Sequence, residues 1–466
     1  MTVVRVVDIV PAERSDETDL NWQPSIAINP ANPDEIVVSA YKEPPNNVGY
    51  SYSYDRGQTW QINFSEPGEQ KDQSAGFGGS GELYWTVAFK PISGIATLHV
   101  LRTTNLSTAG PLPEIDTPRP EIDQPYAHVL THGEPTPPDK DRLYVGYIDR
   151  SHNMGDSAIA TVDVCLDARA AAPSFTQVPI EFRASFPLDG YEVRPAAHSD
   201  GKIYVAYKSW LSYNGSTVIT DIVVVRDDNW GANGFVNLTD SIDSIPGLRV
   251  ATHVHIKDSD TQLLGGQRLD NDLSIAVDPT NSATVYIVWG DNADRHYTLR
   301  MRRSIDCGNT WSGDLLTVAN ANLAGLAINS DGRVGFIYQE LVAGLWETHF
   351  RRTIDNTGQN WDDLILARTA TAGMVADYSR VIAVGKDFYG VFPAWNTPNP
   401  ANFPATPPTP ANPNGARFLR NTTKITPWQL LGSNGLSVAA SVDPFFYMVQ
   451  DESTPDPPTN LMGTVE

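Results

Sequence analysis

The chain has 466 residues, of which 41% are hydrophobic and 19% charged, a composition typical of globular proteins and not of disordered or fibrous ones. Its 55 acidic residues outnumber its 33 basic residues, and the resulting formal charge of -22 argues against a nucleic-acid partner through long-range repulsion. No apolar run approaches the length of about 20 residues that a membrane-spanning helix needs, so we expect a soluble protein without membrane insertion.

Single hydrophobic cores stop growing at roughly 250–300 residues, so a chain of this length is either two domains or one architecture built from repeats. The first ten residues alternate apolar side chains with charge, which predicts a strand and not the apolar core of a signal peptide. Two cysteines, Cys165 and Cys307, imply no disulfide framework and leave the compartment open.

A two-strand unit recurs along the chain. An apolar strand ends in Asn-Pro, Asp-Pro or Asp-Gly, and a second strand rich in aromatic residues follows the turn. The clearest copies are residues 24–41 and 273–289, which are nearly superimposable. Other first strands are expected near Tyr84, Tyr126, Val193, Leu323 and Tyr378. Their second strands include 143–148, 203–207, 334–338 and 388–392.

Seven candidate first strands at intervals of about 40 to 80 residues predict an all-β chain that forms a β-propeller with four-stranded antiparallel blades. The unit around Tyr84 is the weakest copy, so six blades remain the alternative to seven. Closing the ring needs a device, because an open ring exposes a strand edge. We expect residues 3–10 to add the outer strand of the last blade, beside strands from 378–384, 388–392 and 417–420.

Two stretches are irregular in composition. Residues 397–415 are rich in proline, which predicts a long surface loop, extended and not packed, inside the last blade. Residues 451–466 are polar and predict a flexible acidic tail. We therefore expect one propeller domain over residues 1–450.

A turn motif accompanies the strand repeat. Residues 53–60 read Ser-Tyr-Asp-Arg-Gly-Gln-Thr-Trp, residues 304–311 match the same pattern S-x-D-x-G-x-T-W, and residues 353–361 carry it with one insertion. The Asp can accept backbone N–H bonds, the Gly supplies an unusual backbone conformation and the Trp packs below. We assign a structural role to these residues: Ser53, Asp55, Gly57, Trp60, Ser304, Asp306, Gly308, Trp311, Asp355, Gly358 and Trp361.

This motif resembles the Asp box, or BNR repeat, of sialidase-like β-propellers, and the resemblance spans residues 22–431. It implies turns at the periphery, away from the active centre, and favours an extracellular or surface-associated protein. Sialidases hold a substrate carboxylate with three arginines and use a Tyr activated by Glu, with an Asp acid/base. The family's first-blade arginine motif is missing, because residues 21–25 contain no arginine.

Candidate site residues lie where inner strands begin, since sites in propellers are built there. A sialidase-type reaction would use Arg194, Arg380, Tyr378 and Asp272. Glu192 and Asp270 are candidate ligand-binding groups beside them, and each charge could instead belong to a salt bridge or a solvated rim. Trp210, Tyr213 and Trp395 could stack against sugar rings or pack in the core.

Metal binding has weaker support in the sequence. His253 and His255 form a His-x-His pair without a third ligand, so we predict no metal site there. Residues 291–294 could chelate calcium, although they lack a complete ligand series. No other cofactor is expected.

Three functions follow from these observations. The first is a glycan-directed propeller that binds carbohydrate at the channel mouth, with catalysis left open. The second is an exo-glycosidase of sialidase type. The third is a non-catalytic scaffold whose blade loops meet a protein partner in a larger assembly.

Overall fold

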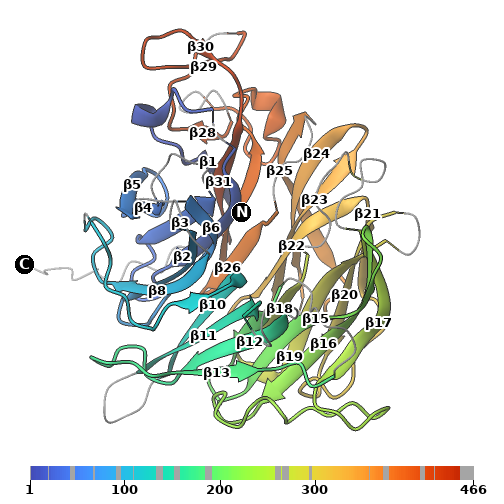
Figure 1. The fold of residues 1–466 in the computed structure, drawn as a ribbon. Helices are drawn as coiled ribbons and strands as arrows, with labels where there is room; N and C mark the ends of the chain where they lie inside the picture. Colours follow the sequence, from blue (N-terminus) through green and yellow to red (C-terminus); the bar gives the residue numbers. More distant parts are fainter. Residues whose placement is uncertain are drawn as a thin grey trace, which may run out of the picture.

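The computed structural model describes residues 2–18, 20–41, 48–66, 69–90, 96–108, 110–132, 140–151, 158–183, 192–257, 264, 272–292, 296–355, 357–370, 377–409, 415–423 and 426–451. These residues form seven sheets of four or five strands arranged in a ring, a seven-bladed β-propeller (Figure 1). Each blade begins with an inner strand, and Figure 1 shows β2, β10, β18, β22 and β26 gathering around the centre of the ring.

The first three blades follow chain order from the inner strand outward. Blade 1 consists of β2 (Trp22–Ile28), β3 (Ile36–Tyr41), β4 (Val48–Ser53) and β5 (Gln61–Glu66). Blade 2 consists of β6 (Glu69–Phe77), β7 (Leu83–Lys90), β8 (Thr97–Thr103) and β9 (Arg119–Pro120). Blade 3 consists of β10 (Ile122–His132), β11 (Lys140–Asp149), β12 (Ile159–Cys165) and β13 (Phe175–Pro179).

The next three blades repeat this order. Blade 4 consists of β14 (Arg194–Ala197), β15 (Ile203–Tyr213), β16 (Thr217–Asp227) and β17 (Leu248–Lys257). Blade 5 consists of β18 (Ser274–Asp278), β19 (Asn281–Asp291), β20 (Thr298–Ser304) and β21 (Leu316–Ala319). Blade 6 consists of β22 (Ala321–Ile328), β23 (Val334–Val342), β24 (Leu345–Thr353) and β25 (Trp361–Ala370).

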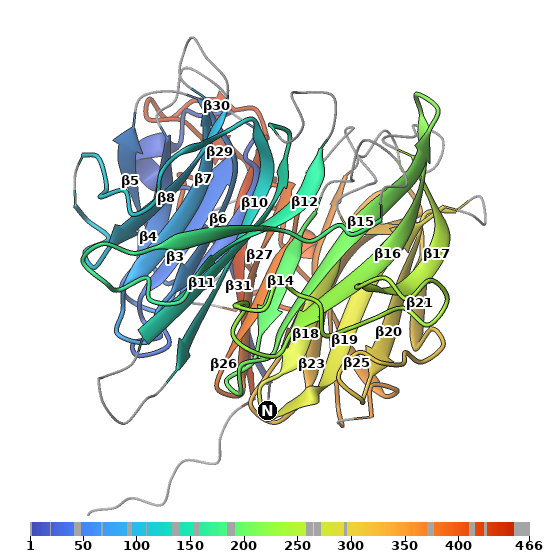
Figure 2. The same cartoon turned by 60° about the horizontal axis from the view of Figure 1, so that its bottom comes forward.

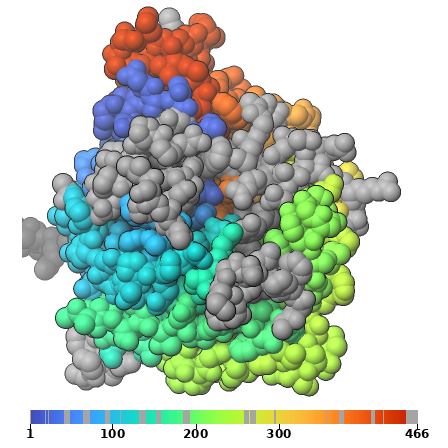
Figure 3. Space-filling model, viewed as in Figure 1, coloured from blue at the N-terminus to red at the C-terminus, as the bar shows by residue number. Residues whose placement is uncertain are grey.

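Blade 7 joins the two ends of the chain. Its order is β26 (Arg380–Val384), β27 (Asp387–Trp395), β31 (Val442–Asp451), β1 (Thr2–Asp8) and β28 (Arg417–Phe418). The N-terminal strand pairs with β31 from Thr2↔Asp451 to Asp8↔Phe445, which confirms that it closes the ring. In the space-filling view the blue N-terminal and red C-terminal segments adjoin at the top (Figure 3).

The prediction for the third strand of blade 7 is wrong. Residues 442–451 fill that place, whereas Arg417–Phe418 lies beyond β1 and pairs with it in parallel as a fifth strand. A long excursion separates β27 from β31, and it contains η2 (Pro400–Asn402) and the hairpin of β29 (Leu430–Leu431) and β30 (Ser437–Val438). The other 3-10 helix, η1 (Ala12–Arg14), follows β1.

Two further expectations need correction. Tyr84 lies on β7, the second strand of blade 2, and not on the inner strand. The inner strand β6 is polar, so its sequence does not indicate an inner strand. The Pro-rich segment is packed where the structure describes it. Phe403 is fully buried against Phe418 and Phe445, since the segment closes over the outer part of blade 7. Residues 410–414 and 452–466 lie outside the described part.

Most of the core fills the gaps between successive blades. Most hydrophobic clusters draw on two neighbouring sheets, as in the cluster of Tyr204, Ile222, Ile287 and Trp289 between blades 4 and 5. A blade is too thin to bury both of its own faces, so every blade depends on its neighbours. Among the described residues no helix is long and apolar enough to cross a membrane.

Candidate functional site at the channel mouth

Side chains from four blades meet where the inner strands begin. Because all inner strands run in the same direction through the ring, their first residues share one end of the channel. We call this end the channel mouth and define it by Tyr126, Glu192, Arg194, Asp272, Tyr378 and Arg380. Arg194 and Arg380 begin β14 and β26, and Asp272 and Tyr378 each lie two residues before an inner strand.

The backbone takes the same unusual turn at the start of several inner strands. Gln23, Gln124, Glu192 and Leu323 all have positive φ, between 51° and 77°, although none is a glycine. Each lies two residues before a residue that pairs in an inner ladder, and the ladder is irregular at three of these places. Such conformations are costly and concentrate at functional positions. This backbone turn therefore recurs in four blades at the end of the channel where the mouth lies.

Glu192 balances two cations. Its Oε1 accepts from Arg194 Nη2 at 2.8 Å, and its Oε2 lies 2.7 Å from Lys208 Nζ. The same Oε2 accepts from the backbone N–H of Leu273 in the next blade at 2.8 Å. All three charged side chains are almost completely buried, so Glu192 fixes the Arg194 guanidinium in place.

Arg380 has a different environment. Its guanidinium carbon lies 4.0 Å from the centroid of the Tyr126 ring and 5.5 Å from that of Tyr378. Arg194 lies 4.9 Å from the same Tyr126 ring. In the described part of the chain, Arg380 makes no ion pair, and burial lowers the pKa of its guanidinium. Two guanidinium groups therefore converge here, and one of them has no direct carboxylate partner.

Tyr378 and Asp272 are the remaining titratable side chains of the channel mouth. Tyr378 donates its hydroxyl to Asp72 Oδ1 at 3.2 Å, and burial together with the charge of Asp72 raises the pKa of Tyr378 well above its usual value. Asp272 accepts from the Tyr297 hydroxyl and from the backbone N–H of Ala324. Burial raises the pKa of Asp272 to about 7, and the charge of Glu192 adds to this effect. Asp272 can therefore exchange a proton near neutral pH.

A cavity of about 390 Å³ extends from the mouth along the inner strands. Tyr126 and Arg380 stand at its entrance, and the middle is lined mainly by small and aliphatic side chains with His128 among them. Burial lowers the pKa of His128 to about 4, and its Nε2 accepts from the Ala197 N–H, so the ring is neutral at physiological pH. Ligand pockets usually have volumes of about 300–1,000 Å³, so a sugar residue fits here.

The structure separates the three candidate aromatic residues. Trp210 is not exposed, because it lies on β15 and packs in the core between blades 4 and 5. Tyr213 is 42% exposed, 5.6 Å from Trp210 between ring centroids, on the part of β15 that projects past the start of β14 (Figure 2). Trp395 is half-buried and packs against the cluster of Leu264, Tyr297, Trp346 and Val442. Asp270 lies outside the described residues.

The S-x-D-x-G-x-T-W turns lie at the opposite end of the blades, between the third and fourth strands. Asp55 Oδ1 accepts from the N–H groups of Gln58 and Thr59, and Trp60 is buried and donates to Gly57 O. Gly57 has φ +77°, and a Cβ there would lie 2.4 Å from Phe446 in blade 7. Asp306 repeats the bonds to Thr310, and Asp355 accepts from Thr357 and Asn360. These residues hold turns together, far from the mouth.

Neither metal hypothesis gains a ligand set. Within the described ranges no group of three or more His, Cys, Asp or Glu side chains is placed to hold a metal ion. His253 has a φ of 54°, so the strand alternation that would align its ring with that of His255 is broken. Asp291 accepts a hydrogen bond from Arg300 Nε at 3.1 Å, and residues 293 and 294 of the proposed calcium loop lie outside the described residues.

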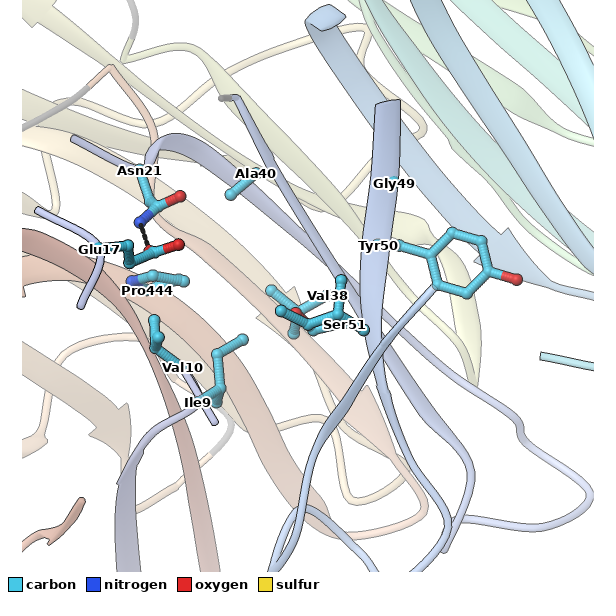
Figure 4. Close-up of a pocket in the computed structure, with 11 residues that line it drawn as sticks. Ile9, Val10, Glu17, Asn21, Val38, Ala40, Gly49, Tyr50, Ser51 and Pro444 are labelled. Carbon is cyan, nitrogen blue, oxygen red and sulfur yellow. Dashed lines mark hydrogen bonds between the residues drawn. The ribbon is translucent and has the colours of Figure 1, made fainter. Parts of the chain in front are cut away.

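A small crevice away from the channel mouth is too small for a ligand. It lies between blades 7 and 1 and is lined by Ile9, Val10, Val38, Tyr50 and Pro444 (Figure 4). Asn21 Nδ2 donates to Glu17 Oε1 across it at 3.0 Å. Its volume of about 10 Å³ leaves room for a single water molecule.

Sequence reasoning missed several residues that contact the channel mouth. Lys208 lies on β15, the second strand of blade 4, and Tyr297 lies directly before β20, the third strand of blade 5. Asp72 belongs to the inner strand of blade 2, which the sequence did not reveal. Tyr126 was recognised only as part of a strand. The one usable signal was that Tyr126, Arg194 and Arg380 hold comparable positions in three different blades.

The seven sheets and their closure define this chain as a seven-bladed β-propeller. No family model and no curated protein matches the sequence. Similar solved structures include an ulvan lyase, a polysaccharide lyase, with TM-score 0.49 and 11% identity over 81% of this chain and 92% of that chain.

Two others are an α-L-arabinanase from Penicillium chrysogenum and the phage phi92 endosialidase. The first has TM-score 0.45 and 11% identity over 84% of this chain and 93% of that chain. The second has TM-score 0.43 and 12% identity over 99% of this chain and 71% of that chain. Similarity at this level does not assign a function.

Proposed function

We propose that this propeller binds an acidic carbohydrate at the channel mouth, with Arg194 and Arg380 facing the carboxylate or sulfate group of the sugar. The observation that carries the proposal is Arg380, whose guanidinium stacks on Tyr126 beside Arg194 and has no ion-pair partner among the described residues. A guanidinium matches a carboxylate or sulfate group through paired hydrogen bonds. The resemblance of the turn motif to sialidase-like propellers supports the same substrate class.

The rest of the mouth suits a sugar. Tyr126 and Arg380 line the cavity of about 390 Å³, which has the volume of a ligand pocket. Arg194 is held rigidly by Glu192, so little side-chain freedom is lost when a ligand binds.

Glycan-array binding and calorimetry with acidic and neutral sugars test this proposal. We expect binding to acidic glycans that is lost in the Arg194→Ala/Arg380→Ala double variant. A Lys386→Ala variant, which removes an exposed surface cation, serves as the control and keeps the binding. Uniformly negative arrays, or binding that survives the double variant, would overturn the proposal.

One observation favours a catalytic version. Tyr378 is hydrogen-bonded to a carboxylate, Asp72, and Asp272 titrates near neutral pH, so a nucleophile with a base and an acid/base group are both available. In the first blade, where the arginine motif is missing, the Gln23 amide donates to Asp377.

Fluorogenic sialosides and a broader glycoside panel distinguish binding from hydrolysis. Turnover by the wild type that is lost in Tyr378→Phe, while this variant still binds the substrate with wild-type affinity, would establish an exo-glycosidase. Absence of turnover on every substrate, with glycan binding intact, would leave a binding protein.

A further inference from the structure

A second cavity, also of about 390 Å³, opens on the side of the ring between blades 4 and 5. We call this space the side cavity. Its lining residues come from β17, β19, β20 and the loop before β21 (Figure 2). The charged and polar ones are Arg249, Thr252, Asp291, Arg300, Arg302 and Asp314. The gap between the blades stays open because β21 has only four residues and the pairing of β17 shifts register beside it.

The floor of the side cavity is an aromatic ring in the core. Trp289 is only 1% exposed and belongs to the cluster that joins blades 4 and 5. The guanidinium carbon of Arg302 lies 5.2 Å from the centroid of the indole. Arg302 also donates from Nη1 to the backbone oxygen of Val250 at 2.6 Å, so it bridges the two blades.

The arginines of the side cavity are already held by carboxylates. Asp314 accepts from Arg302 Nε at 2.7 Å through Oδ1 and from Arg300 Nη1 at 3.0 Å through Oδ2. Arg300 Nε donates to Asp291 at 3.1 Å. Arg249 donates from Nε to Asp240 at 2.8 Å, and its Nη2 lies 3.1 Å from Asp243.

This balance of charge decides the ligand class. An anion gains little where every guanidinium faces a carboxylate, and a cation meets three guanidinium groups. A neutral polyol needs donors and acceptors side by side, and fixed guanidinium and carboxylate groups supply both. Because the ion pairs hold these groups before a ligand arrives, little ordering remains to be done on binding.

We infer that the side cavity binds a neutral sugar residue, so the protein carries two separate carbohydrate sites of different charge preference. The inference is independent of the channel mouth, because none of the mouth residues lines the side cavity. A glycan with acidic and neutral residues could meet the protein at both places.

Saturation-transfer NMR on the full chain tests this inference, with D-glucuronate as the acidic probe and a panel of neutral hexoses, deoxyhexoses and pentoses. Thr252→Trp fills the side cavity from an exposed position. Arg302→Met removes a donor and keeps much of the side-chain volume. The matched variant at the other site is Arg194→Ala/Arg380→Ala, and an unchanged melting temperature verifies the fold of each variant.

We expect at least one neutral sugar to bind with millimolar affinity and to lose about tenfold or more of that affinity in Thr252→Trp and in Arg302→Met. The mouth double variant should leave this binding unchanged. If the neutral sugar binds and loses affinity only in the side-cavity variants, while D-glucuronate does not bind, the inference about the side cavity is supported and the proposal for the channel mouth fails. If no neutral sugar binds, or if binding survives both side-cavity variants, the inference is overturned.

Discussion

Two clusters of buried charge in this molecule look alike in composition and differ in access. The closure seam, formed by β31, β1 and β28, contains Asp8, Asp443 and Arg420, all essentially without solvent exposure. Arg420 Nη1 donates to Asp443 at 2.7 Å, and Asn396 donates to the same carboxylate. At the mouth, Arg194 and Glu192 form a similar buried pair, but Arg380 borders a cavity and has no such partner in the part of the chain that the structure describes.

The comparison shows that buried charge alone is not evidence of a ligand site. In the closure seam Arg420 holds segments near the two ends of the chain together, through Asp443 and the backbone oxygen of Ser15. At the mouth, Arg380 forms no ion pair within the described ranges and lies beside a space large enough for a ligand. The difference predicts large stability effects in the closure seam and mainly binding effects at the mouth.

The largest effect is expected from deleting residues 1–12. This deletion removes β1, whose Val6 and Val7 are buried in the cores on either side of blade 7. Burial of these side chains and Ile9 is worth about 5 kcal/mol or more in total. We expect the melting temperature to fall by about 5 °C or more, measured by calorimetry.

Val3→Lys is the matched control for the deletion. Val3 lies on the same strand and is 39% exposed, so this variant should melt close to the wild type. A deletion variant that melts at the wild-type temperature would show that β1 does not close the ring.

The second prediction compares two arginines directly. Arg420→Met leaves Asp8 and Asp443 buried without a cation, which should cost about 3–5 kcal/mol of unfolding free energy. Arg380→Met removes only contacts with Tyr126 and Tyr378, so we expect a loss of about 1 kcal/mol or less. Urea denaturation measures both values. Equal losses would contradict the distinction between the closure seam and the mouth.

The third prediction concerns the pH dependence of stability. Burial, together with the charge of Asp443, raises the pKa of Asp8 well above its usual value. A carboxyl group with a raised pKa in the folded state binds more protons there than in the unfolded chain. The unfolding free energy therefore falls as the pH rises above the ordinary Asp pKa of about 4.

Asp8→Asn should make this decline shallower and raise the stability relative to the wild type at the alkaline end. Denaturation between about pH 5 and about pH 8 measures the slope. Asp331→Asn, at an exposed position paired with Lys386, should keep the wild-type slope. A slope in Asp8→Asn equal to that of the wild type would mean that Asp8 does not take part.

The smallest effect is expected at Asp272. Its titration should change the affinity of the channel mouth for an acidic ligand. Its pKa of about 7 means that it gains negative charge as the pH rises through neutrality. That charge opposes an acidic ligand at the mouth, so affinity should fall a few-fold across this range. In Asp272→Asn the affinity should change little with pH. Calorimetric titrations at several pH values decide between these outcomes.

The fold was predictable where its signals are local. The strand repeat and the turns at Asp55 and Asp306 lie within short windows, and together they predicted the propeller and its closure. The order of blade 7 was not predictable, because β31 returns after an excursion over residues 396–441 that itself contains short strands. Blade 2 was misread because Glu69–Phe77 carries charge where other inner strands are apolar.

Only part of the mouth could be found from the sequence. Arg194, Arg380, Tyr378, Glu192 and Asp272 share a position at the start of inner strands, so the repeat itself pointed to them. Lys208, Tyr297 and Asp72 reach the same place from other strands or other blades, and no spacing rule connects them. The burial of Trp210 was equally hidden, because it depends on how blade 4 packs against blade 5.

The fifth strand of blade 7 has a consequence for association between molecules. A terminal strand that forms the edge of a sheet can leave it and pair with a second copy of the protein, as happens in domain swapping. Here β28 covers the C-terminal end of the outer edge of β1 through Val7↔Arg417 and Asp8↔Phe418. The chain therefore guards its own N-terminal strand against exchange, and we expect concentrated solutions to stay free of strand-swapped dimers as long as this clasp is intact.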